Sequence, residues 1–100
     1  MDKRIFTAAN LSMYNKSHIK RSKKCGCYYC MNIFSPDEIK EWVDPKNNTA
    51  LCPYCEIDSV LGDDAKDFEL NEEFLKMMHD YWFKGDKSWK LYKKENKDEF

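Results

Sequence analysis

Five cysteines between positions 25 and 55 constrain this chain more than any other feature. Four of them form two pairs with a two-residue gap, a Cys-Tyr-Tyr-Cys run over 27–30 and a Cys-Pro-Tyr-Cys run over 52–55, with 21 residues between the pairs. This spacing is typical of a zinc site, because a tight turn (a zinc knuckle) can aim two thiolates at one ion at about 2.3 Å each. The predicted ligands of one structural Zn²⁺ are Cys27, Cys30, Cys52 and Cys55.

The fifth cysteine leaves two alternatives open. Cys25 can replace Cys27 as the first ligand, although Cys27 gives the more regular pair. Cys25 also follows Lys23 and Lys24, and nearby cations lower the pKa of a thiol. A reactive cysteine at position 25 is therefore a further hypothesis.

Disulfides, redox catalysis and plain buried thiols compete with zinc as explanations of the cysteines. Five is an odd number and the chain starts without a secretory pattern, which disfavours disulfides. A thioredoxin-like dithiol needs one active pair in a βαβ context, which this sequence lacks. Four thiolate ligands leave no open coordination position, so we expect a structural rather than a catalytic metal.

Length and composition favour one small domain that needs a metal to stabilise it. The chain has 100 residues, of which 42% are apolar, 35% charged and 15% aromatic. It is too aromatic for a disordered chain, and a core of this size is often supplemented by a bound ion. No stretch is apolar enough to cross a bilayer, so we expect a cytoplasmic protein without a membrane partner.

Charge divides the chain into a basic N-terminal segment (1–24, formal charge +6), an acidic middle (25–85, −8) and a C-terminal stretch (86–100, +1). We predict a zinc-stabilised domain over 25–92, preceded by the basic segment and followed by a charged, frayed tail over 93–100. The basic segment is either a solvated arm or a nucleic-acid contact. Its candidate contact residues are Lys16, Lys20, Arg21, Lys23 and Lys24.

Local signals predict several elements around the cysteines. Ser35 and Glu38 form a capping box around Pro36, which predicts a helix over 36–43. A second helix is expected over 53–61, with Gly62 as its stop. Ile5-Phe6 and the stretch 11–14 indicate one or two strands.

The clearest helix is predicted over 72–84, with Asn71 as its N-cap and Gly85 after its end. One apolar stripe at helical spacing should pack on the zinc module, and it comprises Phe74, Leu75, Met78, Tyr81 and Trp82. The stretch 88–92 is either a short strand or a last helical turn. Candidate partner contacts outside the stripe are Met77, Phe83 and Trp89.

Residues 27–63 resemble the zinc frame of cysteine-bearing HNH endonucleases. The two cysteine pairs, the capped helix that begins at 35–38 and the Gly62-Asp63 pair carry this resemblance. It implies a hairpin between the knuckles and a helix opened by the second one. Where that family has an Asp-His pair, this chain has Asp44-Pro45, so the resemblance implies the frame without the catalytic histidine.

A wider part of the chain resembles a family of small uncharacterised bacterial cytoplasmic proteins. The residues that carry this resemblance are Ala50–Cys55, the run 57–63, Phe74-Leu75 and the run 78–83. It implies a cytoplasmic, stand-alone protein and no particular activity. Glu56 stands where we expect glycine after the knuckle.

Together these observations predict an α+β, treble-clef-like zinc-binding domain with a C-terminal aromatic helix. We expect a non-catalytic interaction or regulatory module whose partner is a protein, since the acidic middle would repel nucleic acid. One alternative is a zinc finger that binds nucleic acid through the segment 16–24. A second alternative is a divergent, HNH-type metal-dependent nuclease that uses His18 or His79.

Overall fold

A computed structural model describes residues 2–92 of the chain. Three α-helices, two 3₁₀ turns and five short strands are present in these residues, which confirms the predicted α+β class. In chain order they are α1 (Arg4–Asn10), α2 (Lys16–Arg21), β1 (Cys25–Cys27), β2 (Ile33–Phe34), η1 (Pro36–Glu38), β3 (Trp42–Val43), β4 (Thr49–Ala50), β5 (Val60–Gly62), α3 (Glu72–Trp82) and η2 (Ser88–Leu91).

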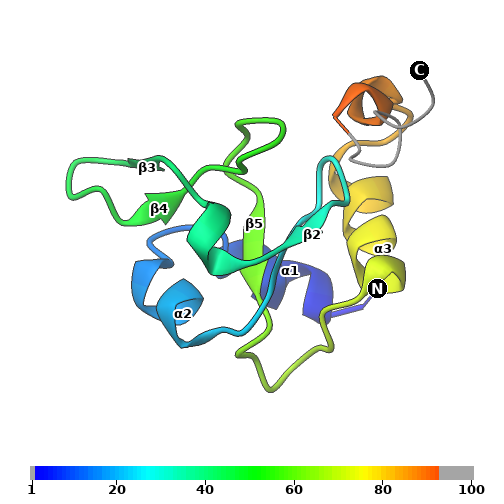
Figure 1. Ribbon diagram of the computed structural model, residues 1–100. Helices are drawn as coiled ribbons and strands as arrows, with labels where there is room; N and C mark the ends of the chain where they lie inside the picture. Colours follow the sequence, from blue (N-terminus) through cyan, green and yellow to red (C-terminus); the bar gives the residue numbers. More distant parts are fainter. Residues whose placement is uncertain (1, 93–100) are drawn as a thin grey trace.

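An antiparallel sheet of three strands, in the order β2-β1-β5, lies at the centre of the fold. Figure 1 shows this sheet between α2 on one side and α3 on the other. The strands β3 and β4 pair separately as a hairpin. The predicted C-terminal aromatic helix is α3, and α1 packs against it.

The central sheet separates two hydrophobic cores, because successive side chains of a strand point to opposite faces. Leu61 faces the core shared by α1 and α3, together with Leu75 and Met78 of α3. Cys27 and Val60 face the other core, which Ile19 of α2 covers. The cysteines of β1 therefore lie in the core beneath α2, not in the core beneath α3.

Two glycines let the helices approach the sheet closely. A Cβ atom at Gly26 would lie 2.9 Å from Cδ1 of Leu75 on α3. A Cβ atom at Gly62 would lie 2.1 Å from Oγ of Ser22, just after α2, and 3.0 Å from Nε2 of His18. A larger side chain at Gly26 would force the Leu75 side chain to shift, and one at Gly62 would force Ser22 to shift.

The predicted N-terminal strands are wrong, because Ile5 and Phe6 lie in α1 and residues 11–14 form the turn between α1 and α2. Ile5 and Ala8 lie one helical turn apart and are buried together against α3. The prediction followed the β-forming Ile5-Phe6 pair, although Ala8 and Ala9, which follow it closely, favour a helix. Residues 2–24 of the basic segment are thus folded onto the domain rather than extended as an arm.

The helix predicted over 36–43 is also wrong beyond its first turn. The capping box is present, since Asp37 N donates to Ser35 Oγ and Ser35 N donates to Glu38. After η1 the backbone becomes extended at Ile39 (ψ 124°), and Trp42 pairs with Ala50 in the β3–β4 hairpin. Residues 44–48 form the turn that connects these two strands.

The helix predicted over 53–61 is wrong as well, and a strand takes its place. Glu56 adopts a left-handed conformation (φ 65°), which a helix cannot continue through. Val60 then pairs with Cys27 as part of β5. The second knuckle therefore leads into the central sheet, whereas the second knuckle of a treble clef opens a helix.

The helix predicted over 72–84 is confirmed as α3. Asn71 Oδ1 accepts a hydrogen bond from Phe74 N, and Gly85 (φ 75°) follows the end of the helix. Three residues of the stripe (Phe74, Leu75 and Met78) are fully buried, Tyr81 is half-buried and Trp82 is 40% exposed.

Residues 88–91 form the helical turn η2, which decides between the two alternatives for that stretch. The tail predicted over 93–100 lies outside the described residues.

Substitution of Gly26 by alanine should destabilise the fold by about 1–3 kcal/mol, since the new Cβ would overlap Leu75. Leu75→Val, which removes the overlapping Cδ atoms, should cost about 1 kcal/mol alone. The double variant should lose less stability than the two single variants added together. Urea unfolding of the four proteins measures this, and strict additivity would contradict the close approach of α3 to β1.

Candidate metal centre

The two cysteine pairs adopt the same backbone loop. Tyr29 N donates to Cys27 Sγ (3.3 Å), and Tyr54 N donates to Cys52 Sγ (3.3 Å). One further backbone hydrogen bond closes each loop. Met31 N donates to Cys27 O (2.8 Å) in the first, and Glu56 N donates to Cys52 O (2.9 Å) in the second. Both predicted knuckles are therefore present as equivalent turns.

The residue after each second cysteine is left-handed, with φ 60° at Met31 and 65° at Glu56. This conformation favours glycine, because a Cβ atom crowds the following carbonyl at a cost of about 1–2 kcal/mol. The expectation of glycine at position 56 thus described the backbone correctly, although the chain carries glutamate there. Each knuckle therefore contains one strained residue directly after its second cysteine.

The four predicted ligands converge on one point. The Sγ atoms of Cys27, Cys30, Cys52 and Cys55 all lie within 4.8 Å of one another, and all four residues are buried. The Cys27–Cys55 and Cys30–Cys52 sulfur pairs are each 3.6 Å apart. Four sulfurs at about 2.3 Å from a central zinc ion would lie about 3.8 Å apart. The sulfurs are therefore spaced to hold one tetrahedral metal ion, and none is in a disulfide.

Four polar groups other than the ligands lie within hydrogen-bonding distance of the sulfurs. Besides the two knuckle amides, Asn32 Nδ2 lies 3.2 Å from Cys30 Sγ and Ser59 Oγ lies 3.1 Å from Cys27 Sγ. Four thiolates around a divalent cation carry a net charge of −2. Hydrogen bonds from these groups would stabilise that charge inside the core.

The thiols of this cluster shift one another's acidity. Burial raises the pKa of Cys27, whereas hydrogen bonds from the neighbouring thiols, that of Cys27 first, lower the pKa of Cys30. The four sulfurs cannot all ionise without a cation, because buried like charges repel. A divalent metal would replace the shared protons with four thiolate bonds.

Cys25 lies outside this group. It precedes Cys27 by two residues on β1, where it pairs with Gly62 and is fully buried. Burial, with a smaller contribution from Asp63, raises the pKa of its thiol to about 12. The prediction that Lys23 and Lys24 lower this pKa is therefore wrong, because the buried sulfur loses hydration and also feels the nearby carboxylate.

The two histidines contact other parts of the fold. His18 Nε2 accepts a hydrogen bond from Gly62 N (3.1 Å), which fixes α2 to β5, and burial lowers the pKa of its imidazole. His79 is buried at the end of α3, where its Nε2 lies 3.0 Å from Asp86 O. Neither imidazole belongs to the sulfur cluster.

The hairpin implied by the nuclease resemblance is present, with Asp44 at its turn. The Asp44 carboxylate accepts hydrogen bonds from Lys46 N (2.7 Å), Asn48 N (3.2 Å) and Thr49 Oγ1 (2.7 Å). These three bonds stabilise the left-handed backbone of Asp44 (φ 84°). The carboxylate thus has a structural role in the turn.

The predicted nucleic-acid contacts lie on and after α2, with acidic neighbours. Lys16 Nζ lies over the ring of Trp42 at 5.3 Å, and Arg21 pairs with Asp64 at 2.8 Å. Asp63 accepts hydrogen bonds from the backbone amides of Lys23 and Lys24, which follow the helix. Lys20 is exposed beside a hollow of about 400 Å³ between α2 and η1.

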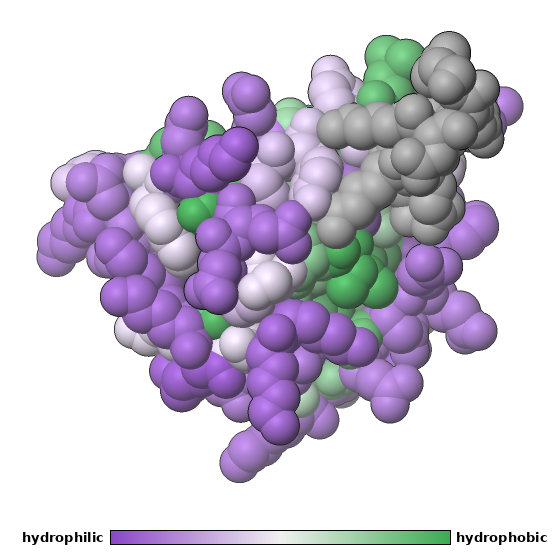
Figure 2. All heavy atoms as spheres, in the orientation of Figure 1, coloured by the Kyte–Doolittle hydropathy of each residue, from purple (hydrophilic) through white to green (hydrophobic). Residues whose placement is uncertain are grey.

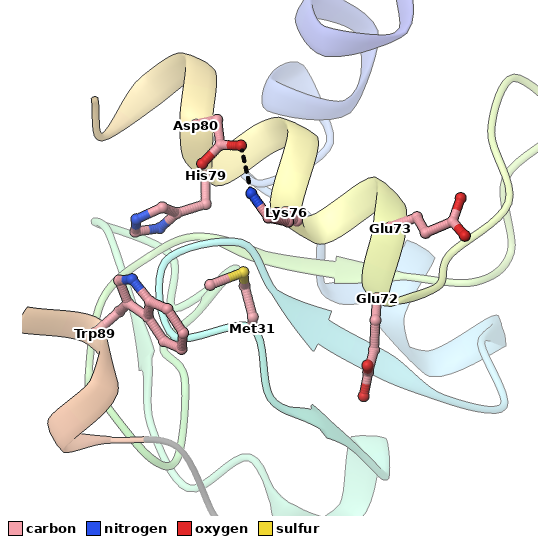
Figure 3. Close-up of a pocket in the computed structure, with 7 residues that line it drawn as sticks. All are labelled: Met31, Glu72, Glu73, Lys76, His79, Asp80 and Trp89. Carbon is pink, nitrogen blue, oxygen red and sulfur yellow. Dashed lines mark hydrogen bonds and ion pairs between the residues drawn. The ribbon is translucent and has the colours of Figure 1, made fainter. Parts of the chain in front are cut away.

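The predicted partner contacts Met77, Phe83 and Trp89 are all half-buried. Phe83 lies against Tyr29 of the first knuckle, with ring centroids 4.9 Å apart. Trp89 lies beside His79 (5.8 Å) at the edge of a cavity of about 320 Å³. Figure 3 shows Met31 of the first knuckle between Trp89 and α3 in this cavity.

Three buried polar residues of the site were not predicted from the sequence. Asn15 bridges the strands on either side of the second knuckle, since it donates to Val60 O (2.9 Å) and accepts from Ala50 N (3.1 Å). Asn32 donates to Cys30 Sγ, and Ser59 Oγ shares a hydrogen bond with Cys27 Sγ. An alignment of the two knuckles on their cysteines would have marked Asn32, because Ile57 stands at its equivalent position.

Comparisons with known proteins add no relative, since no protein-family model, curated protein or solved structure matches this chain. The resemblances to HNH endonucleases and to small bacterial cytoplasmic proteins therefore stay predictions. The candidate site rests on its own geometry.

Substitution of Cys27 by alanine should abolish stoichiometric metal binding, whereas Cys25→Ala should leave one ion per chain. The two residues lie on the same face of β1, yet only the Cys27 sulfur belongs to the cluster. Elemental analysis of the purified proteins gives the measurement. One metal ion per chain in the Cys27→Ala variant as well would show that Cys25 can serve as the ligand.

Proposed function

We propose that this protein is a small zinc-binding module in which one structural Zn²⁺ stabilises the fold. The observation that supports this proposal is the group of four buried sulfurs on two equivalent knuckles. Tetrahedral four-sulfur sites are typical of zinc or iron–sulfur centres, and the Cys-x₂-Cys knuckle pair is typical of zinc. We place the protein in the cytoplasm, where thiols stay reduced.

The proposed role is non-catalytic. A zinc ion with four thiolate ligands has no open position for water or substrate, so it would contribute folding energy rather than chemistry. Both histidines make structural contacts, and neither belongs to the group of sulfurs that could hold the ion. Binding of a macromolecule is then the proposed mode of action.

A protein is the proposed partner. An exposed aromatic patch, the Phe6–Trp82 patch, joins α1 and α3, with the two rings edge-to-face at 5.9 Å. Phe6 is 42% exposed and Trp82 is 40% exposed. Aromatic side chains of this kind are enriched at protein interfaces, and the −8 formal charge of residues 25–85 would repel phosphates.

Nucleic-acid binding is the second candidate, and the surface beside α2 favours it. Lys20 and Lys23 line the hollow beside η1 together with Trp42, whose ring Lys16 also contacts. Lysines can bind a phosphate backbone, and a neighbouring ring such as the half-buried Trp42 can stack on a base. The pairing of Arg21 with Asp64 reduces the positive charge of this face.

Within residues 2–92, no helix has both the length and the apolar character needed to cross a membrane. Figure 2 shows one largely hydrophilic face of the molecule, with hydrophobic residues gathered between β2 and α3.

The purified protein should contain one zinc ion per chain and should unfold when a strong chelator removes it. Structural zinc contributes about 10–16 kcal/mol of apparent binding free energy in small domains, more than a core of this size supplies alone. Elemental analysis and circular dichroism with and without chelator provide the measurements. A metal-free protein that stays folded in chelator would contradict the proposal.

Substitution of both Phe6 and Trp82 by alanine should abolish capture of a partner protein from cells, while Lys20→Ala with Lys23→Ala should not. Affinity capture with mass spectrometry compares the two double variants against the unaltered protein. Gel-shift titrations on single-stranded DNA and RNA should show no binding near physiological salt. Salt-dependent binding lost in the lysine variant would instead favour the nucleic-acid alternative.

A further inference from the structure

The two knuckles differ at one buried position. Asn32 and Ile57 each follow the second cysteine of a pair by two residues, and each uses its backbone oxygen to accept the amide of the first cysteine, at 3.1 Å and 3.0 Å. Ile57 adds only an apolar side chain there. Asn32 adds a side-chain amide and is 2% exposed.

The Asn32 amide connects a sulfur ligand to the C-terminal part of the fold. Its Nδ2 atom lies 3.2 Å from Cys30 Sγ and 2.7 Å from the backbone oxygen of Tyr92. An amide nitrogen carries two hydrogens, so one group can serve both acceptors at once. The second knuckle contacts a different part of the fold, since Tyr54 Oη donates a hydrogen bond to the Glu38 carboxylate of η1.

The segment 86–92 packs on the first knuckle through further contacts. Tyr29 Oη donates to Asp86 Oδ2 (3.1 Å), and the rings of Tyr29 and Tyr92 lie 6.3 Å apart. Trp89 packs against both hydrophobic cores and lies at the cavity beside Met31 (Figure 3). Docking of this segment thus depends on residues that the first knuckle positions.

We propose that Asn32 couples metal binding at Cys30 to docking of the segment 86–92, so that each stabilises the other. This inference rests on the proposed metal site. A metal-bound thiolate is a fixed, charged acceptor and orients the Asn32 amide more strongly than a thiol does. The second hydrogen of that amide then points at Tyr92 O. Because coupling between two binding events is reciprocal, a docked segment should also raise metal affinity.

The test is a double-mutant cycle on the full chain, with Zn²⁺ affinity measured by competition with a chromophoric chelator. Asn32→Ala removes the link, and Trp89→Ala weakens docking without touching a sulfur. Asn32→Ala should weaken Zn²⁺ binding by about tenfold or more. If the two residues act independently, the fold losses in Zn²⁺ affinity of the single variants multiply in the double variant. We expect the double variant to lose less affinity than this product, by about threefold or more.

Two matched pairs serve as controls. Ile57→Ala truncates the equivalent position of the second knuckle, and its effect should multiply fully with that of Trp89→Ala. Phe6→Ala truncates another half-exposed aromatic residue that contacts α3, and its effect should multiply fully with that of Asn32→Ala. If the fold losses in Zn²⁺ affinity of Asn32→Ala and Trp89→Ala also multiply fully, the proposed coupling is overturned.

Two further readouts separate this role from general loss of packing. In the Co²⁺-loaded protein, Asn32→Ala should move the sulfur-to-metal charge-transfer band to lower energy, because the sulfur loses a hydrogen bond. In the Zn²⁺-loaded protein, amide exchange over 89–92 should be faster in Asn32→Ala than in Ile57→Ala. An unchanged band with unchanged exchange would overturn the proposal. Failure of the unaltered protein to bind either ion would overturn the metal site itself.

Discussion

Convergence of four sulfurs inside the protein is the constraint on which the rest of the structure depends. The two knuckles belong to different parts of the chain, one between β1 and β2 and the other between β4 and β5. Neither can be placed without the other, because each supplies half of one tetrahedral site. An ion at this point would join the central sheet to the β3–β4 hairpin, which the small cores alone hold weakly.

The central sheet transmits this constraint to the helices. Its alternating faces give the cysteine side to α2 and the Leu61 side to α1 and α3. Gly26 permits α3 to lie close to the sheet, and Gly62 does the same for α2. The His18 imidazole also fixes α2, because it accepts a hydrogen bond from the Gly62 amide. Helices that are too short to be stable alone are thus held by contacts on a sheet whose own strands have two or three residues.

The sequence predicted those parts of the fold that local chemistry determines. The Asn71 cap and a full apolar stripe identified α3, and the cysteine spacing identified both knuckles. The capping box at Ser35 was correct for one turn, but the pairing of Trp42 with Ala50 overrode the helix that was expected to follow. Val60 and Leu61 fitted a helical spacing equally well, and only the partner strand β1, remote in sequence, makes them a strand. The contacts of Asn15 and Ser59 also join residues remote in sequence, so local patterns could not predict them.

Gly26 has a consequence for which cysteine reaches the metal. Cys25 and Cys27 point to the same side of β1, so a slip of the strand by two residues would exchange them without reversing its faces. The same slip would carry Lys24 into the place of Gly26, where its long charged side chain would meet Leu75 and Leu70. Misligation by the neighbouring thiol is therefore penalised on the opposite side of the sheet, by a residue that binds no metal.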